Sequence, residues 1–212
     1  MFRASRQVLV IGISLLLAVA AVLFIIQARS GPASLAFWFE SIGDDARTTL
    51  PDRLSGDISP DDMSAIEAIA REEIVQAFRD YPISVVGRAA TQYHVRVVDS
   101  MESPMGGSAE SYVFPGMGGQ GYINFRSLAH GAVTYAPPDA DRREVVAAIG
   151  RGIGRAAVHE FTHQLLGRQA PIDDSTDIQS YEYGSTNRRE QYYGQIRWGI
   201  AAPMLRVKFG LD

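Results

Sequence analysis

A chain of 212 residues is long enough for one compact domain with an attached segment, and too short for two comfortable domains. The net charge of −4 comes without a basic block or alternating aromatic and basic residues, so we expect no nucleic-acid partner. The chain has no cysteine, which excludes disulfides, thiolate metal sites and cysteine nucleophiles; any metal must be bound by histidines and carboxylates.

The N-terminal segment predicts a membrane anchor. Residues 8–26 are uncharged and apolar, follow Arg3 and Arg6, and would span about 28 Å as a helix. A cleaved signal peptide ending near Ser30 is the alternative, but the apolar run exceeds the usual length of such a core. We therefore expect residues 1–29 to anchor the chain in the cell membrane by a single pass. The positive flank predicts that the remainder lies on the non-cytoplasmic side.

Residues 30–58 are expected to form a connector that is polar and contains helix-breaking residues. Within it, residues 37–39 (Phe-Trp-Phe) lie either at the lipid headgroups or at the start of the domain's packing. A domain over residues 59–212 then begins with an amphipathic helix of about 20 residues, capped by Ser59 and ending before Pro82. We expect the charged residues of this helix to form a solvated face.

Short strands are predicted at residues 83–86 and 93–98, from their apolar and alternating residues. Residues 99–121, rich in glycine, are expected to form a long loop. Residues 122–125 predict another strand, either an edge strand beside a cleft that holds an extended peptide or an ordinary hairpin strand. His130 is expected in a loop.

A long helix is predicted from about residue 142 to residue 166, with an N-cap in the preceding Pro-Pro-Asp-Ala-Asp segment and Gly167 as C-cap. Gly150, Gly152 and Gly154 lie within it, each costing up to about 1 kcal/mol relative to alanine. They either permit close packing on a neighbour or mark a weak, kinked first half.

The second half of this helix contains the motif His-Glu-x-x-His. His159 and His163 are four residues apart and therefore share one face, where two imidazoles fit a tetrahedral zinc ion. Glu160 lies beside them, where a carboxylate can hold a metal-bound water and take its proton. These three residues predict a zinc site with a general base.

A third ligand is expected downstream of His163. The pattern with a further histidine six residues after the second one fails, because Gln169 occupies that place. The remaining acids are Asp173, Asp174, Asp177, Glu182 and Glu190. Glu190 is favoured because residues 187–190 begin a second helix, although the same residues also fit a capping box; Asp177 is the second choice. Asp173 and Asp174 fit a turn after Pro171, or a role in orienting a histidine.

The segment Glu-Tyr-Gly-Ser-Thr-Asn-Arg-Arg-Glu-Gln-Tyr-Tyr, residues 182–193, resembles the start of the second metal-binding helix in two metallopeptidase families. These are the families of anthrax lethal factor and of Mlc titration factor, and the His-Glu-Phe-x-His-Gln-Leu stretch is similar to the latter. The resemblance implies that Glu190 is the third zinc ligand and that Tyr183 lies near the substrate carbonyl. The chain departs from both at Gly194, where these families carry another acid.

The sequence thus predicts an α+β fold, in which core helices pack on a small mixed or antiparallel sheet in a zincin-like domain. The expected function is that of a membrane-anchored zinc metallopeptidase that acts on peptides or proteins. Zinc is bound by His159, His163 and Glu190, with Glu160 as general base and Tyr183 as oxyanion donor. Two alternatives stay open: an inactive zinc-binding module and a membrane-tethered recognition module.

Overall fold

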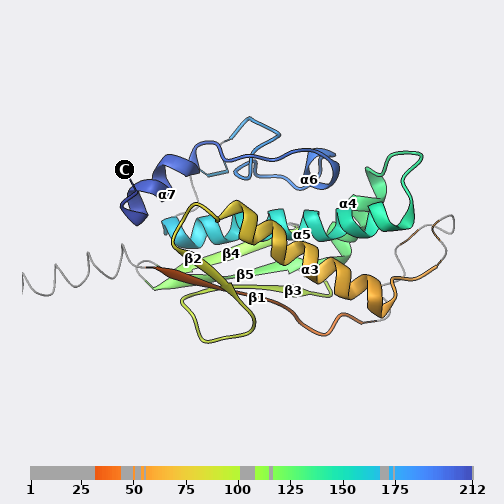
Figure 1. Ribbon diagram of the computed structural model, residues 1–212, viewed down its shortest axis with the longest axis horizontal. Coiled ribbons are helices and arrows are strands. Elements are labelled where there is room, and N and C mark those ends of the chain that lie inside the picture. The colour runs from red at the N-terminus through yellow and green to blue at the C-terminus, as the bar shows by residue number, and fades with distance from the viewer. Residues whose placement is uncertain are drawn as a thin grey trace, which may run out of the picture.

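Five strands form a single mixed sheet in the computed structural model of the chain (Figure 1). The structure describes residues 32–43, 50, 54, 56–100, 108–114, 117–167, 172–173 and 175–211. The strands are β1 (Ala33–Phe39), β2 (Ile83–Val86), β3 (Tyr93–Val98), β4 (Ala109–Phe114) and β5 (Gly118–Asn124). Their order is β2-β1-β3-β5-β4, and only β4 runs antiparallel to its neighbour.

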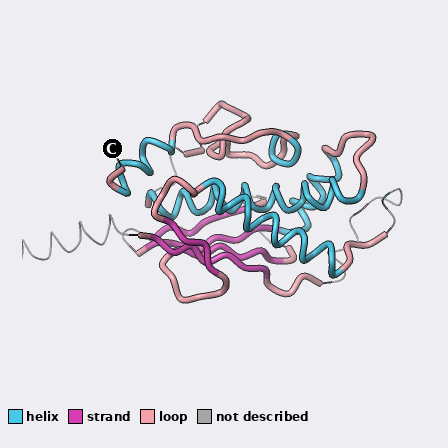
Figure 2. The backbone as a smooth tube through the Cα atoms, in the orientation of Figure 1, coloured by secondary structure: helices cyan, strands magenta, loops and turns pink. Residues whose placement is uncertain are grey.

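Helices cover one face of this sheet. They are α3 (Pro60–Ala77), α4 (Phe125–Thr134), α5 (Arg142–Leu166), α6 (Glu190–Tyr193) and α7 (Ala201–Phe209). Helices α3 and α5 contact each other and lie over the sheet, while α6 and α7 lie on the far side of α5 (Figures 1 and 2). Strand side chains on the helical face are fully buried, including those of Leu35, Phe37, Val95, Val97 and Ile123. The core therefore lies between sheet and helices, and α5 runs through its middle.

Several predicted elements are confirmed. The first helix is capped by Ser59 as expected, within a capping box in which Ser59 Oγ accepts from Asp62 N at 3.2 Å and Asp62 accepts from Ser59 N at 2.8 Å. The strands at residues 83–86 and 93–98 have the predicted bounds. The long helix is capped by Asp141 and ends at Gly167, which adopts the left-handed conformation with φ 69°.

The predicted α+β class is wrong, because the domain is mixed α/β. Strand β1 precedes α3, and β2 follows it, so the helix connects two parallel neighbours in the sheet. Parallel pairing also joins β1 to β3 and β3 to β5.

Strand β1 also corrects the connector predicted for residues 30–58, since it lies between β2 and β3. Phe37 is fully buried there, so the aromatic residues begin the packing of the domain. The predicted loop at residues 99–121 contains β4 and the start of β5. Residues 122–124 belong to β5, which is interior and pairs antiparallel with the preceding β4, so the hairpin alternative holds and the edge-strand alternative is wrong; β4 lies at that edge of the sheet. His130 lies in α4, not in a loop.

The predicted membrane anchor requires a further correction. Within the described ranges, none of the helices combines the length and the apolar character that crossing a bilayer requires. The expected span, residues 8–26, lies outside the residues that the structure describes. The single-pass assignment and the location outside the cytoplasm are therefore not supported, and we withdraw both.

The glycines of α5 serve close packing, the first of the two roles considered for them. A Cβ atom added to Gly154 would lie 2.6 Å from Ala70 O and 2.7 Å from Glu73 Cβ on α3. One added to Gly150 would lie 2.8 Å from Ile69 Cβ. The two helices can approach this closely only because neither position carries a side chain.

We expect Gly154→Ala to lower the free energy of unfolding by about 1–3 kcal/mol, because the added methyl group would push α3 and α5 apart. The better helix propensity of alanine, worth about 1 kcal/mol, offsets part of this cost. Urea denaturation measures the effect. Gly87→Ala is the matched control, since a Cβ there meets no atom within 4 Å. Equal unfolding free energies for both variants would contradict the close packing.

Candidate functional site

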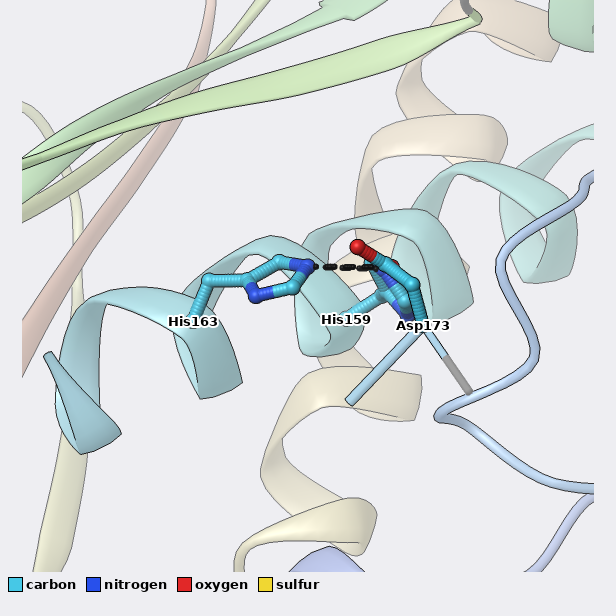
Figure 3. Close-up of side chains that lie close together, drawn as sticks. All are labelled: His159, His163 and Asp173. Atoms are coloured by element: carbon cyan, nitrogen blue, oxygen red, sulfur yellow. Dashed lines mark hydrogen bonds and ion pairs between the residues drawn. The ribbon is translucent and has the colours of Figure 1, made fainter. Parts of the chain in front are cut away.

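Helix α5 places His159 and His163 one turn apart on the same face. Their Nε2 atoms lie 3.0 Å apart, and the ring planes meet at 81°. Figure 3 shows both rings directed toward a common point beside the helix. The structure thus brings together the two histidines that the spacing paired.

Asp173 completes this cluster from the chain that follows α5. Its Oδ1 atom lies 2.9 Å from His159 Nε2 and 3.3 Å from His163 Nε2 (Figure 3). The three residues form a group whose ligand atoms could hold a metal ion. Zinc bonds of about 2.0–2.1 Å in a tetrahedral site would separate the ligand atoms by roughly 3.3 Å, close to the spacings found here.

The hydrogen bond on the other side of the His159 ring places a hydrogen on Nδ1. His159 Nδ1 lies 2.7 Å from Tyr181 O. A carbonyl oxygen only accepts, so Nδ1 carries a hydrogen, and in the neutral ring Nε2 then carries the lone pair that a cation needs. Histidine ligands of metals are commonly oriented by such a bond to a carbonyl. The site therefore presents converging acceptor atoms, which fit a bound cation.

The same atoms also bind protons. When the Nε2 atoms of His159 and His163 are protonated, they donate to Asp173, and these hydrogen bonds hold the pKa of the Asp173 carboxyl well below its usual range. Burial lowers the pKa of His159, but the hydrogen bond to Asp173 and the charge of Glu160 outweigh this and raise the pKa. The cluster attracts positive charge.

Glu160 lies next to this cluster in a buried position. Glu160 is only 4 % exposed, and burial raises the pKa of its carboxyl group. Ser111 of β4 contacts it, since Ser111 Oγ donates to the main-chain oxygen of Glu160 at 3.3 Å. A carboxylate with a raised pKa can accept a proton and then release it, which suits a general base.

A cleft of about 760 Å³ opens over these residues. It is lined by residues of α5, by residues 108–112 at β4, and by residues 181, 183–188 and 191. Gln164 of α5 joins this helix to the sheet. Its side chain bonds both main-chain groups of His94, at 3.1 and 2.9 Å, and donates to Ser111 Oγ at 3.1 Å. The end of the site helix is therefore fastened to the strand that borders the cleft.

A buried ion pair positions the far side of the cleft. Arg155 Nε donates to Glu73 Oε1 at 3.0 Å, and Tyr181 OH donates to the same oxygen at 3.1 Å. Arg155 also donates to the main-chain oxygens of Glu190 and Gln191. Through Tyr181, this network holds the carbonyl that orients His159. Sequence reasoning placed Glu73 on a solvated face and so missed it.

The remaining predicted residues lie in different places. Tyr183 lines the cleft. Glu190 begins the short helix α6 and does not join the histidine cluster among the described residues; the capping box considered as its alternative role is not formed either, since α6 has no side-chain cap. Asp177 pairs with Arg197 at 3.0 Å. Glu182 is buried and accepts from the main-chain nitrogens of residues 199 and 201. Asp174 lies outside the described residues.

Asp173 was considered a turn residue or an orienting residue, and its place beside both histidines is the main difference from the expected site. Its sequence context offers little signal, because an acid after a proline is equally typical of a turn. Position in the chain, shortly after the helix that carries both histidines, was the available hint.

Comparisons with known proteins give little further information. No family model matches the chain, and no curated protein matches it. Among solved structures, the chain is similar to myroilysin at a TM-score of 0.27 and 12% sequence identity. The match covers 73% of this chain and 55% of that one, so the chain spans about half the length of myroilysin. A likeness this low carries no argument, and the site must be judged from its own geometry.

Proposed function

We propose that the chain is a zinc-dependent peptidase in which His159, His163 and Asp173 bind the metal. The convergence of two imidazole nitrogens and one carboxylate oxygen, at 2.9–3.3 Å, carries this proposal. Catalytic zinc sites use three such protein ligands and leave one position for water. When bound, zinc would lower the pKa of a water ligand and polarise the substrate carbonyl.

Glu160 is the proposed general base. From its buried place beside the cluster, its carboxylate would accept a proton from the attacking water and deliver that proton to the leaving amine. Tyr183, which lines the same cleft, is proposed to donate a hydrogen bond to the developing oxyanion.

Strand β4 is the proposed support for an extended peptide. It is the last strand of the described sheet, and its residues 109–112 line the cleft. Its outer edge pairs with no further strand of the described sheet, and a peptide could add there as a further strand. This moves the peptide-binding edge from residues 122–125, predicted from the sequence, to β4.

The proposed function is tested with the full chain, denatured protein substrate and mass spectrometry of the products. We expect cleavage that stops on removal of metal by a chelator and returns on addition of zinc. Bound zinc without cleavage of any substrate would indicate an inactive zinc-binding module instead. Cleavage that is unaffected by the chelator would contradict the proposal.

The third ligand is tested by zinc affinity. We expect Asp173→Ala to weaken zinc binding by more than about a hundredfold, since loss even of a residue that supports a ligand costs about 10–100-fold. Competition with a chromophoric chelator measures the dissociation constant. Glu190→Ala and Asp177→Ala should bind zinc as the wild type does. Full affinity in Asp173→Ala and lost affinity in Glu190→Ala would show that Glu190 is the ligand.

A further inference from the structure

Two arginines line the cleft, and they differ in how their charge is balanced. Arg155 is 7 % exposed and pairs with Glu73 at 3.0 Å. Arg188 is 8 % exposed, yet among the described residues no carboxylate lies within ion-pair distance of it. Within the described part of the chain this buried cation thus has no ion pair, and the carboxylates of Glu190 and Asp177 attract it only from farther away.

The contacts of Arg188 are all with neutral groups. Its guanidinium donates to the main-chain oxygens of Ile178 and Ser180, and to Gln191 Oε1 at 3.1 Å. The guanidinium carbon lies 4.7 Å from the centre of the Tyr183 ring. Arg188 Nε is buried and has no hydrogen-bond partner. The side chain is therefore held firmly in place, and two of its five N–H groups, that of Nε and one of Nη1, have no acceptor among the described residues.

The buried charge of Arg188 favours an anionic ligand in the cleft. A buried charge without a counter-charge is costly, and an anion that approaches it gains a charge-assisted hydrogen bond. Arginine suits this role, because its planar fork matches the geometry of a carboxylate. The fixed position of Arg188 also means that little side-chain freedom is lost when an anion binds.

We propose that Arg188 is a specificity residue that binds a carboxylate of the peptide substrate. The inference rests on the proposed peptidase function and names the substrate class: peptides with an acidic side chain or a free C-terminal carboxylate near the cleaved bond. Both sources present the same chemical group to Arg188.

The test measures binding of peptide hydroxamates to the zinc-loaded full chain by calorimetry. One pair of probes differs only in glutamate against glutamine, and a second pair differs only in a C-terminal acid against an amide. We expect the wild type to prefer the carboxylate member of one pair by about tenfold to a hundredfold. The pair that shows the preference identifies the source of the carboxylate.

Arg188→Gln should remove this preference while the neutral probes still bind. Arg79→Gln is the control, because Arg79 is exposed on the surface and does not line the cleft; it should keep the preference. Zinc content and circular dichroism of each variant show whether it has folded. If Arg188→Gln does not fold, Arg188→Lys, which keeps the charge without the fork, should bind the carboxylate probe more weakly than the wild type.

The outcomes separate this inference from the proposed function. If neither probe of a pair binds and no zinc is retained, the peptidase proposal itself fails. If both members of both pairs bind the wild type equally well, the metal site stands and the carboxylate subsite is wrong. A preference that persists in Arg188→Gln would also overturn the role of Arg188.

Discussion

Glu160→Gln should reduce peptide hydrolysis by about a hundredfold to ten-thousandfold while zinc remains bound, because a general base contributes this much to such reactions. Glutamine has nearly the same shape as glutamate but cannot take a proton from water. The measurement is kcat/KM on a cleaved peptide, together with zinc content.

Glu144→Gln is the matched control for this variant. Glu144 lies on the same helix, in its exposed first turn, and should leave both activity and zinc content unchanged. Activity retained in Glu160→Gln would remove the proposed mechanism. Zinc lost together with activity would instead give Glu160 a role in metal binding.

Glu73→Ala should lower the free energy of unfolding by about 3–5 kcal/mol, which is the usual cost of leaving one partner of a buried ion pair uncompensated. The remaining partner is Arg155, whose side chain is 8 % exposed. Tyr181 would lose its acceptor as well. Because Tyr181 O orients His159, zinc affinity should fall together with stability.

Glu72→Ala is the control for the change at Glu73, since Glu72 is the neighbouring glutamate on α3 and is exposed. Surface substitutions of this kind usually change stability by less than about 0.5 kcal/mol. Urea denaturation and chelator competition measure the two effects. A cost for Glu73→Ala no larger than that of Glu72→Ala would show that the ion pair contributes little.

The two long helices, α3 and α5, were the part of the fold that the sequence predicted well. Their caps have local causes: Ser59 and Asp62 bond within one turn, and Gly167 ends α5 because it adopts a left-handed conformation. Strand β3 alternates clearly between polar and apolar residues, and its bounds were predicted correctly. Local chemistry was sufficient for these elements.

Strands β1, β4 and β5 show where local chemistry was not sufficient. Strand β1 is a short apolar run next to a longer one, and its place in the sheet depends on distant partners. Strand β5 begins with glycines, which are typical of loops. Here a Cβ at Gly119 would lie 2.7 Å from Gln164, so close packing by the site helix explains the glycine. Such contacts cannot be read from neighbouring residues.

The candidate site likewise has a part that local sequence predicted and a part that depends on tertiary packing. The pairing of His159 with His163, and the place of Glu160 beside them, follow from the helical repeat, so the sequence was enough. The choice among the downstream acids depends on how the chain returns after Gly167, which the sequence does not determine. The structure places Asp173 there, whereas Glu190 was expected by resemblance. Glu73 comes from another helix altogether, and only tertiary packing reveals it.

A crystal structure of the zinc-loaded protein, with diffraction recorded on both sides of the zinc absorption edge, tests the central claim most directly. We predict a single anomalous peak per chain, bound by His159 Nε2, His163 Nε2 and a carboxylate oxygen of Asp173. Bond lengths should be about 2.0–2.2 Å. Absence of a peak at these residues, or a peak bound elsewhere in the chain, would contradict the proposed metal centre.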